Sequence, residues 1–144
     1  MAWPPHITVA TIVRQADRFL MVEEEIDGEL VINQPAGHLE PGETLLEAAV
    51  RETLEETAWQ VRLEGISGLY QYHAPGPDIL YHRICFLATP LQETSQVLDS
   101  DIHRCLWLSR EALSDRKLRS PLVLRCIDDA LQRDPVPLSF ISHL

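Results

Sequence analysis

Three glutamates at helical spacing carry the strongest chemical signal in this chain. Glu52, Glu55 and Glu56 stand at positions i, i+3 and i+4, so on a helix their carboxylates project from one face. Such like charges destabilise an isolated helix by about a few tenths of a kcal/mol per pair, and a bound cation would offset this repulsion. Mg²⁺ suits the site because it takes oxygen ligands. The spacing alone also fits a solvated face on which Arg51 pairs with Glu47 and Glu55.

A helix must hold these glutamates, and the sequence predicts one over residues 44–57. Pro41-Gly42 precedes it, and the segment from Thr44 to Glu47 fits a capping box, in which the two side chains satisfy free backbone N–H groups. Apolar or weakly polar residues recur at 3.6-residue spacing and are expected to face the core: Leu46, Ala49, Val50, Thr53 and Leu54.

The remaining elements predict an α/β or α+β sandwich with a mixed sheet, formed as one domain over residues 1–144. Strands are predicted over residues 7–13, 18–22, 30–32, 61–72, 79–88 and 102–108. Ser109 is expected to cap a short helix, and a last helix should run from Ser120 to about Arg133. The acidic segment 23–28 is expected to be a hairpin loop, and the first two strands, 7–13 and 18–22, are expected to be antiparallel. Strands interleaved with helices are typical of such layered folds.

Composition excludes several classes of protein. The chain has 144 residues, 45% of them hydrophobic and 24% charged, as in an ordinary globular domain. Its net charge of −10 disfavours binding to nucleic-acid polymers and anionic membranes. No apolar run approaches the roughly 20 residues that cross a bilayer, and no signal peptide is recognisable. Cys85, Cys105 and Cys126 lack metal-site or redox spacing, which favours free thiols in a cytoplasmic protein.

The segment from Gly37 to Trp59 resembles the Nudix box, G-x5-E-x7-R-E-U-x-E-E-x-G-U, where U is apolar. The final apolar position is Trp59, and six defining residues match at full spacing: Gly37, Glu43, Arg51, Glu52, Glu55 and Glu56. Thr53 stands at an apolar position, where its methyl group can still pack. Ala58 replaces the glycine that would end the helix, so a left-handed turn there would cost roughly 1 kcal/mol. Further segments resemble a bacterial phosphatase of this family over residues 6–137.

The resemblance implies a metal-dependent hydrolase of small diphosphate compounds. Glu52, Glu55 and Glu56 would bind Mg²⁺, with Mn²⁺ as an alternative, and Glu52 is the preferred general base. The backbone carbonyl of Gly37 would be a further ligand. An ion pair between Arg51 and Glu43 would hold the loop against the helix. The metal would neutralise phosphate charge and activate water. A phosphate substrate could therefore bind despite the negative net charge of the chain.

Residues outside the box are expected to bind the substrate. Arg83 interrupts an apolar strand and needs a partner, either substrate phosphate or a surface glutamate. Gln34 and His38 flank the Pro-Ala-Gly segment, where they would contact substrate or stabilise the loop. Some Nudix enzymes supply an extra acid after the box, and Asp99 or Asp101 would be that acid unless both lie in a solvated loop.

The function implied by this resemblance is removal of terminal phosphate from nucleoside tri- and diphosphates, with release of orthophosphate. The diphosphate of hydroxymethylpyrimidine is a further expected substrate. One alternative is a pyrophosphohydrolase that releases pyrophosphate, and another is a non-catalytic nucleotide-sensing module. A monomer or homodimer is expected.

Overall fold

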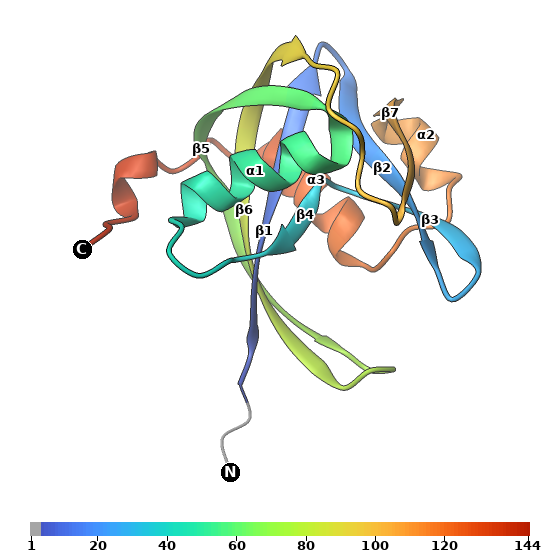
Figure 1. Cartoon of the computed structure of the whole chain (residues 1–144), viewed down its shortest axis with the longest axis horizontal. Coiled ribbons are helices and arrows are strands. Elements are labelled where there is room, and N and C mark those ends of the chain that lie inside the picture. The colour runs from blue at the N-terminus through green and yellow to red at the C-terminus, as the bar shows by residue number, and fades with distance from the viewer. Residues whose placement is uncertain (1–3) are drawn as a thin grey trace.

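A mixed sheet forms the centre of the molecule in the computed structural model, which describes residues 4–144 (Figure 1). The order of its main path is β3-β2-β1-β6-β5, with β4 paired to β1 and β7 paired to β2. β1 and β6 are parallel, and the other pairs are antiparallel. The strands are β1 (His6–Gln15), β2 (Arg18–Ile26), β3 (Glu29–Asn33), β4 (Ala36–His38), β5 (Trp59–Ala74), β6 (Ile79–Glu93) and β7 (Ile102–Ser109).

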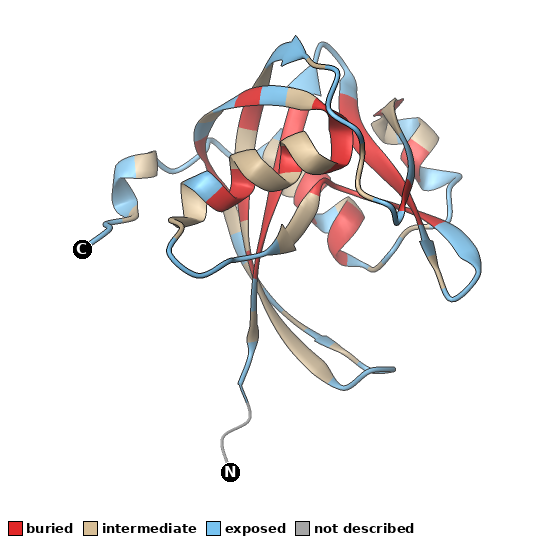
Figure 2. Ribbon diagram, in the orientation of Figure 1, coloured by how far each residue is buried: buried red, intermediate tan, exposed pale blue. Residues whose placement is uncertain are grey.

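Helices cover both faces of the sheet. Neighbouring residues of β1 point to opposite faces, so they pack against different helices. Val9 packs with Ala48 and Ala49 of α1 (Leu45–Thr57), whereas Ala10 packs in the cluster that contains α3 (Leu122–Gln132). α2 (Arg110–Ser114) and the 3₁₀ turn η1 (Leu138–Phe140) complete the elements. Buried residues lie on the strands and on the inner sides of the helices (Figure 2). The predicted sandwich with a mixed sheet is therefore confirmed.

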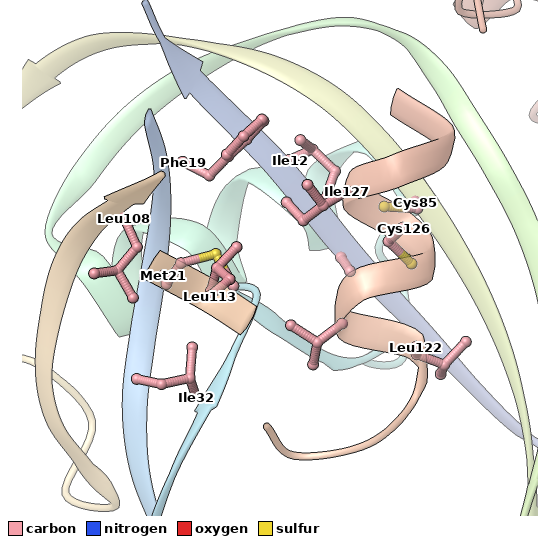
Figure 3. Close-up of a cluster of buried hydrophobic side chains, with 12 residues drawn as sticks. Ile12, Phe19, Met21, Ile32, Cys85, Leu108, Leu113, Leu122, Cys126 and Ile127 are labelled. Atoms are coloured by element: carbon pink, nitrogen blue, oxygen red, sulfur yellow. The ribbon is translucent and has the colours of Figure 1, made fainter. Parts of the chain in front are cut away.

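The larger core cluster fixes α3 against the sheet. Figure 3 shows Cys126 and Ile127 of α3 facing Ile12 of β1 and Cys85 of β6. All four side chains are at most 1% exposed. Burial of apolar side chains at about 25 cal/mol per Å² is the main stabilising contribution here. This packing sets the position of the segment 119–122, which borders the cavity described below.

The acidic segment 23–28 differs from its prediction. Residues 23–26 continue β2 and pair with β3 and β7, so only Asp27 and Gly28 form the turn. Glu23 and Glu24 are buried, at 8% and 7% exposure. The expected loop was wrong because Arg104 and Asn33 provide partners for these two carboxylates inside the sheet. Arg104 lies far away in sequence, and Asn33 is brought to Glu24 by the register of β2 with β3. The three-residue strand β4 was also missed.

Helix α1 begins as the sequence predicts, although its most buried side differs. The Thr44 side chain accepts from the Glu47 N–H, and the Glu47 side chain accepts from the Thr44 N–H, which confirms the capping box. Thr53 is fully buried and its hydroxyl bonds with that of Thr11 at 2.7 Å. Ala49 and Thr53 face the core as predicted. Leu46, Val50 and Leu54 are only half-buried, because the helix is rotated so that Ala48, Glu56 and Thr57 are buried instead.

The end of α1 yields a stability prediction. Ala58 adopts the left-handed conformation at φ 64°, where its N–H donates to the Leu54 carbonyl. Glycine takes this conformation without the steric cost of a Cβ, so Ala58→Gly should raise the free energy of unfolding by about 1 kcal/mol. Ala48→Gly, inside the helix, should lower it by at least that amount. Urea denaturation measures the free energy of unfolding of both variants. Destabilisation by Ala58→Gly would contradict the claim that the left-handed conformation of Ala58 is strained.

Candidate active site

Three carboxylates meet at the C-terminal half of α1. Glu52 and Glu56 come from the helix, and Asp99 comes from the loop between β6 and β7, which runs beside the helix end (Figure 1). One oxygen from each lies within 4.8 Å of the others. The Asp99 N–H donates to the Glu55 carbonyl at 3.0 Å, and this bond fixes the loop on the helix. Three acidic oxygens at this separation fit a divalent cation that prefers oxygen ligands.

Glu56 is the most constrained member of this acidic cluster. It is 6% exposed, and one oxygen accepts from the Ala36 N–H at 2.8 Å. Burial raises the pKa of Glu56 to about 9, and the negative charges of Glu52 and Glu24 act in the same direction. No arginine, lysine or histidine of residues 4–144 lies within ion-pair distance of it. The solvated helix face is therefore excluded for Glu56, and its environment lacks a positive charge.

Gly37 allows the loop to approach Glu52 closely. A Cβ added at residue 37 would overlap the Glu52 carboxyl group, so any larger residue there would displace this carboxylate from its position beside the loop. The Gly37 backbone belongs to β4, which is paired with β1 through Val9. β4 and α1 thus present backbone and carboxylate groups to the same space. Burial raises the pKa of Glu52, while Arg51 opposes that shift.

Arg51 joins the loop to the helix through several contacts. Its Nη2 and Nε donate to the two oxygens of Glu43 at 2.7 and 2.9 Å, and its Nη1 donates to Glu52 at 2.9 Å. The His38 carbonyl also accepts from Nη2 at 3.1 Å. Hydrogen bonds from Arg51 lower the pKa of Glu43. Bidentate pairs of this kind hold geometry as well as charge.

Glu55 occupies a different environment from Glu52 and Glu56. Its carboxylate lies 3.2 Å from Arg51 Nη1, and its side chain is 35% exposed. The close group of three therefore contains Asp99 where the helical spacing predicted Glu55. Asp99 lies 43 positions beyond Glu56, so only the resemblance to the family pointed to this loop.

The acidic cluster opens into a cavity of about 620 Å³. His38, Arg83, Asp99 and Asp101 line it, whereas Gln34 does not. Other lining residues were not predicted, because strand pairing and the path of the chain before α3 bring them to the cavity, and no local motif encodes either: Glu24, Asn33, Arg119 and Ser120. Tyr72 and Tyr81 lie opposite each other on β5 and β6 and form another part of the wall. Such a cavity is large enough for a nucleotide-sized ligand.

Arg83 is a buried cation without an anionic partner. It is 7% exposed; its Nη1 donates to Gln34 Oε1 at 3.1 Å, and its Nε has no partner. No carboxylate among residues 4–144 lies within ion-pair distance, so the expected surface glutamate is absent there. Gln34 also donates to the Val123 carbonyl at 2.7 Å, which ties this arginine to α3. A buried guanidinium normally needs a partner, and an anionic ligand in the cavity would serve.

His38 and Asp101 lie at the margins of this arrangement. His38 Nε2 is 3.3 Å from His6 Nδ1, and burial together with His6 lowers the pKa of His38. Asp101 lies outside the close group of three, although its charge raises the pKa of Asp99. Both residues border the cavity, where a ligand of the acidic cluster would pass them.

Comparison with known proteins identifies the family. The model of the NUDIX domain matches residues 4–126. This chain belongs to the Nudix family. It is similar to Phosphatase NudJ of Escherichia coli strain K12, with 41% identity over 138 residues that cover 93% of this chain and 90% of the relative. A Nudix hydrolase acts on phosphoric anhydrides.

Solved structures agree with this Nudix fold. A NUDIX hydrolase from Nitrosomonas europaea superposes with a TM-score of 0.95 and 34% identity, covering 98% of both chains. The NUDIX domain of Shewanella oneidensis NrtR, solved with ADP ribose, has a TM-score of 0.75 and 15% identity over 92% of this chain and 90% of its own. The second likeness concerns the fold alone. No helix within residues 4–144 is long and apolar enough to cross a membrane.

The environment of Glu56 predicts how stability depends on pH. Its pKa is raised from 4.5 to about 9 on folding, so the folded protein holds a proton that the unfolded chain releases. The metal-free protein should therefore lose stability as the pH rises from about 4.5 towards 9, by roughly 3 kcal/mol near pH 7. Glu56→Gln keeps the shape and removes this ionisation, so it should be the more stable protein at pH 8.

Urea denaturation in EDTA at pH 5, 7 and 8 measures this difference. Glu111→Gln changes an exposed glutamate of α2 and controls for the loss of one negative charge. A difference between wild type and Glu56→Gln that stays constant with pH would contradict the proton held at Glu56.

Proposed function

We propose that this Nudix hydrolase uses Mg²⁺, or Mn²⁺ in its place, to remove terminal phosphate from nucleoside tri- and diphosphates. Hydroxymethylpyrimidine diphosphate is proposed as a further substrate, and orthophosphate as the product. The observation that carries this proposal is the presence in one cavity of a carboxylate cluster whose Glu56 has no cationic partner and a buried Arg83 that has no anionic partner among residues 4–144. A divalent cation and a phosphate group would satisfy both. The 41% identity to Phosphatase NudJ supports orthophosphate as the product.

The proposed metal ligands are Glu52, Glu55, Glu56 and the carbonyl of Gly37, with Asp99 added by its position. The closely spaced oxygens and the missing positive charge beside Glu56 support this assignment. When bound, the metal supplies charge neutralisation, orients the diphosphate and lowers the pKa of an attacking water.

The protein residues then perform the proton and positioning steps. We assign the general base to Glu52, because Arg51 holds one of its oxygens at 2.9 Å and the other has no partner among residues 4–144. This free oxygen would take the proton of the attacking water. The Arg51–Glu43 pair supports the base by fixing its orientation.

Arg83 is proposed to bind substrate phosphate, since its guanidinium borders the cavity and Gln34 fixes it from behind. Gln34 would therefore act as a positioning residue. His38 and Asp101 would contact the substrate from the margins of the cavity. A cytoplasmic location remains part of the proposal, as the cysteine pattern suggests.

Product analysis tests this function. Purified protein with Mg²⁺ and ATP, ADP, GTP or hydroxymethylpyrimidine diphosphate should release orthophosphate, and EDTA should abolish the reaction. Glu56→Gln should lower the rate at least about a hundredfold, because it removes the charge that holds the metal. Glu111→Gln should keep the wild-type rate. Circular dichroism checks that both variants are folded.

The identity of the released product decides between the alternatives. Pyrophosphate together with a nucleoside monophosphate would contradict the proposal and indicate a pyrophosphohydrolase. Wild-type turnover in Glu56→Gln would contradict the metal-binding role of that carboxylate.

A further inference from the structure

A pair of buried polar residues lines the cavity at the end formed by β2 and β3. Glu24 and Asn33 lie diagonally across these antiparallel strands, so their side chains share one face of the sheet. They are 7% and 8% exposed. Neither is used by the proposed metal site or by the proposed proton transfer. Ile26 and Leu122 border the same cavity and supply apolar surface.

This pair leaves two hydrogen-bond acceptors without a donor. Asn33 Nδ2 donates to Glu24 Oε1 at 3.3 Å, and Arg119 Nε lies 3.7 Å from that same oxygen. Asn33 Oδ1 is buried and has no partner. Among residues 4–144 no hydrogen bond or ion pair reaches Glu24 Oε2. Buried acceptors such as Asn33 Oδ1 are normally satisfied, and Glu24 Oε2 is a further free acceptor in the same cavity, so a donor that enters the cavity would satisfy both oxygens.

The groups closest to Glu24 are hydrogen-bond donors, which suit an accepting carboxylate: Asn33 Nδ2 donates to Oε1, and Arg119 Nε lies 3.7 Å from the same oxygen. Burial raises the pKa of Glu24, and the hydrogen bond from Asn33 and the charge of Arg119 oppose this effect. An ionised carboxylate only accepts hydrogen bonds. A carbonyl oxygen of a ligand would meet two acceptors here and be repelled, whereas an N–H₂ group would donate one hydrogen to each.

We propose that Glu24 and Asn33 bind the exocyclic amino group of the substrate's heterocycle and so select amino-bearing bases over their oxo counterparts. This inference rests on the proposed function and defines its substrate class. Adenine and cytosine carry an amino group where hypoxanthine and uracil carry an oxygen. A site built to hydrogen-bond a particular group discriminates strongly against analogues that lack it.

Binding of nucleoside monophosphates tests the selection directly. AMP, IMP, CMP and UMP contain no phosphoric anhydride, so isothermal titration in the presence of Mg²⁺ measures affinity without turnover. AMP should bind at least about tenfold more tightly than IMP, and CMP at least about tenfold more tightly than UMP. Equal affinities within each pair, or no binding of any of the four, would overturn the inference.

Glu24→Gln should reverse the preference. Its amide oxygen would accept from Asn33 and Arg119, which leaves an N–H₂ donor where the free Oε2 stood. The oxo bases should then bind more tightly than the amino bases. Glu23→Gln is a matched control, because Glu23 is equally buried on the same strand but pairs with Arg104 and does not line the cavity. An unchanged preference in Glu24→Gln would contradict the assignment.

A second variant keeps the test decisive if Glu24→Gln does not fold. Asn33→Leu has a similar volume and removes the free Oδ1, so it should reduce both affinity ratios towards one. Full retention of both ratios would overturn the role of this residue. Orthophosphate release is assayed on the same preparations: release without base preference refutes only this inference, and base preference without release refutes only the proposed hydrolysis.

Discussion

The arrangement of this site depends on one constraint: the charges at the end of α1 are not balanced within the protein. Arg51 compensates Glu43, Glu52 and Glu55 through contacts of 2.7 to 3.2 Å. Its guanidinium does not reach Glu56, whose carboxylate is held in the interior by the Ala36 N–H. Burying an uncompensated carboxylate is costly, and the group takes up a proton instead. A cation bound beside Glu56 would stabilise this ionised carboxylate.

The same cavity also contains a buried positive charge that no negative charge of residues 4–144 balances. Arg83 is buried, is fixed by Gln34 and lacks an anionic partner within residues 4–144. A cluster that needs a cation and a guanidinium that needs an anion are complementary to a metal–phosphate complex. Each charge alone would have an ordinary structural explanation, but the two together favour phosphate chemistry. Burial is therefore a cost to folding that ligand binding offsets.

The sequence predicts those parts of the site that are local in the chain. The capping box, the helix and the spacing from Gly37 to Glu56 all lie within one short segment, so their geometry follows from helical periodicity. The antiparallel pairing of β1 with β2 was predicted for the same reason, and the sandwich was predicted from the order of strands and helices along the chain. Ala58 was recognised as a strained helix end, and it does adopt a positive φ.

The sequence could not predict how separate elements meet. Asp99 reaches the end of α1 from the loop between β6 and β7, and the contact of Asn33 with Glu24 depends on the register of β2 and β3. Segment 23–26 was expected to be a solvated loop because its charged residues are normally exposed. The partners of these residues are identified only by the pairing of β2 with β3 and β7 in the structure.

The proton held by Glu56 offers the most direct test of the account. A cation that binds this carboxylate must displace its proton, since metal ligands are deprotonated. Isothermal titration of the protein with Mg²⁺ at pH 7.5, repeated in buffers of different ionisation enthalpy, measures the protons released. We predict release of about one proton per metal site in the wild type and markedly less in Glu56→Gln. Metal binding without proton release, or binding unchanged in Glu56→Gln, would contradict the central role of this buried carboxylate.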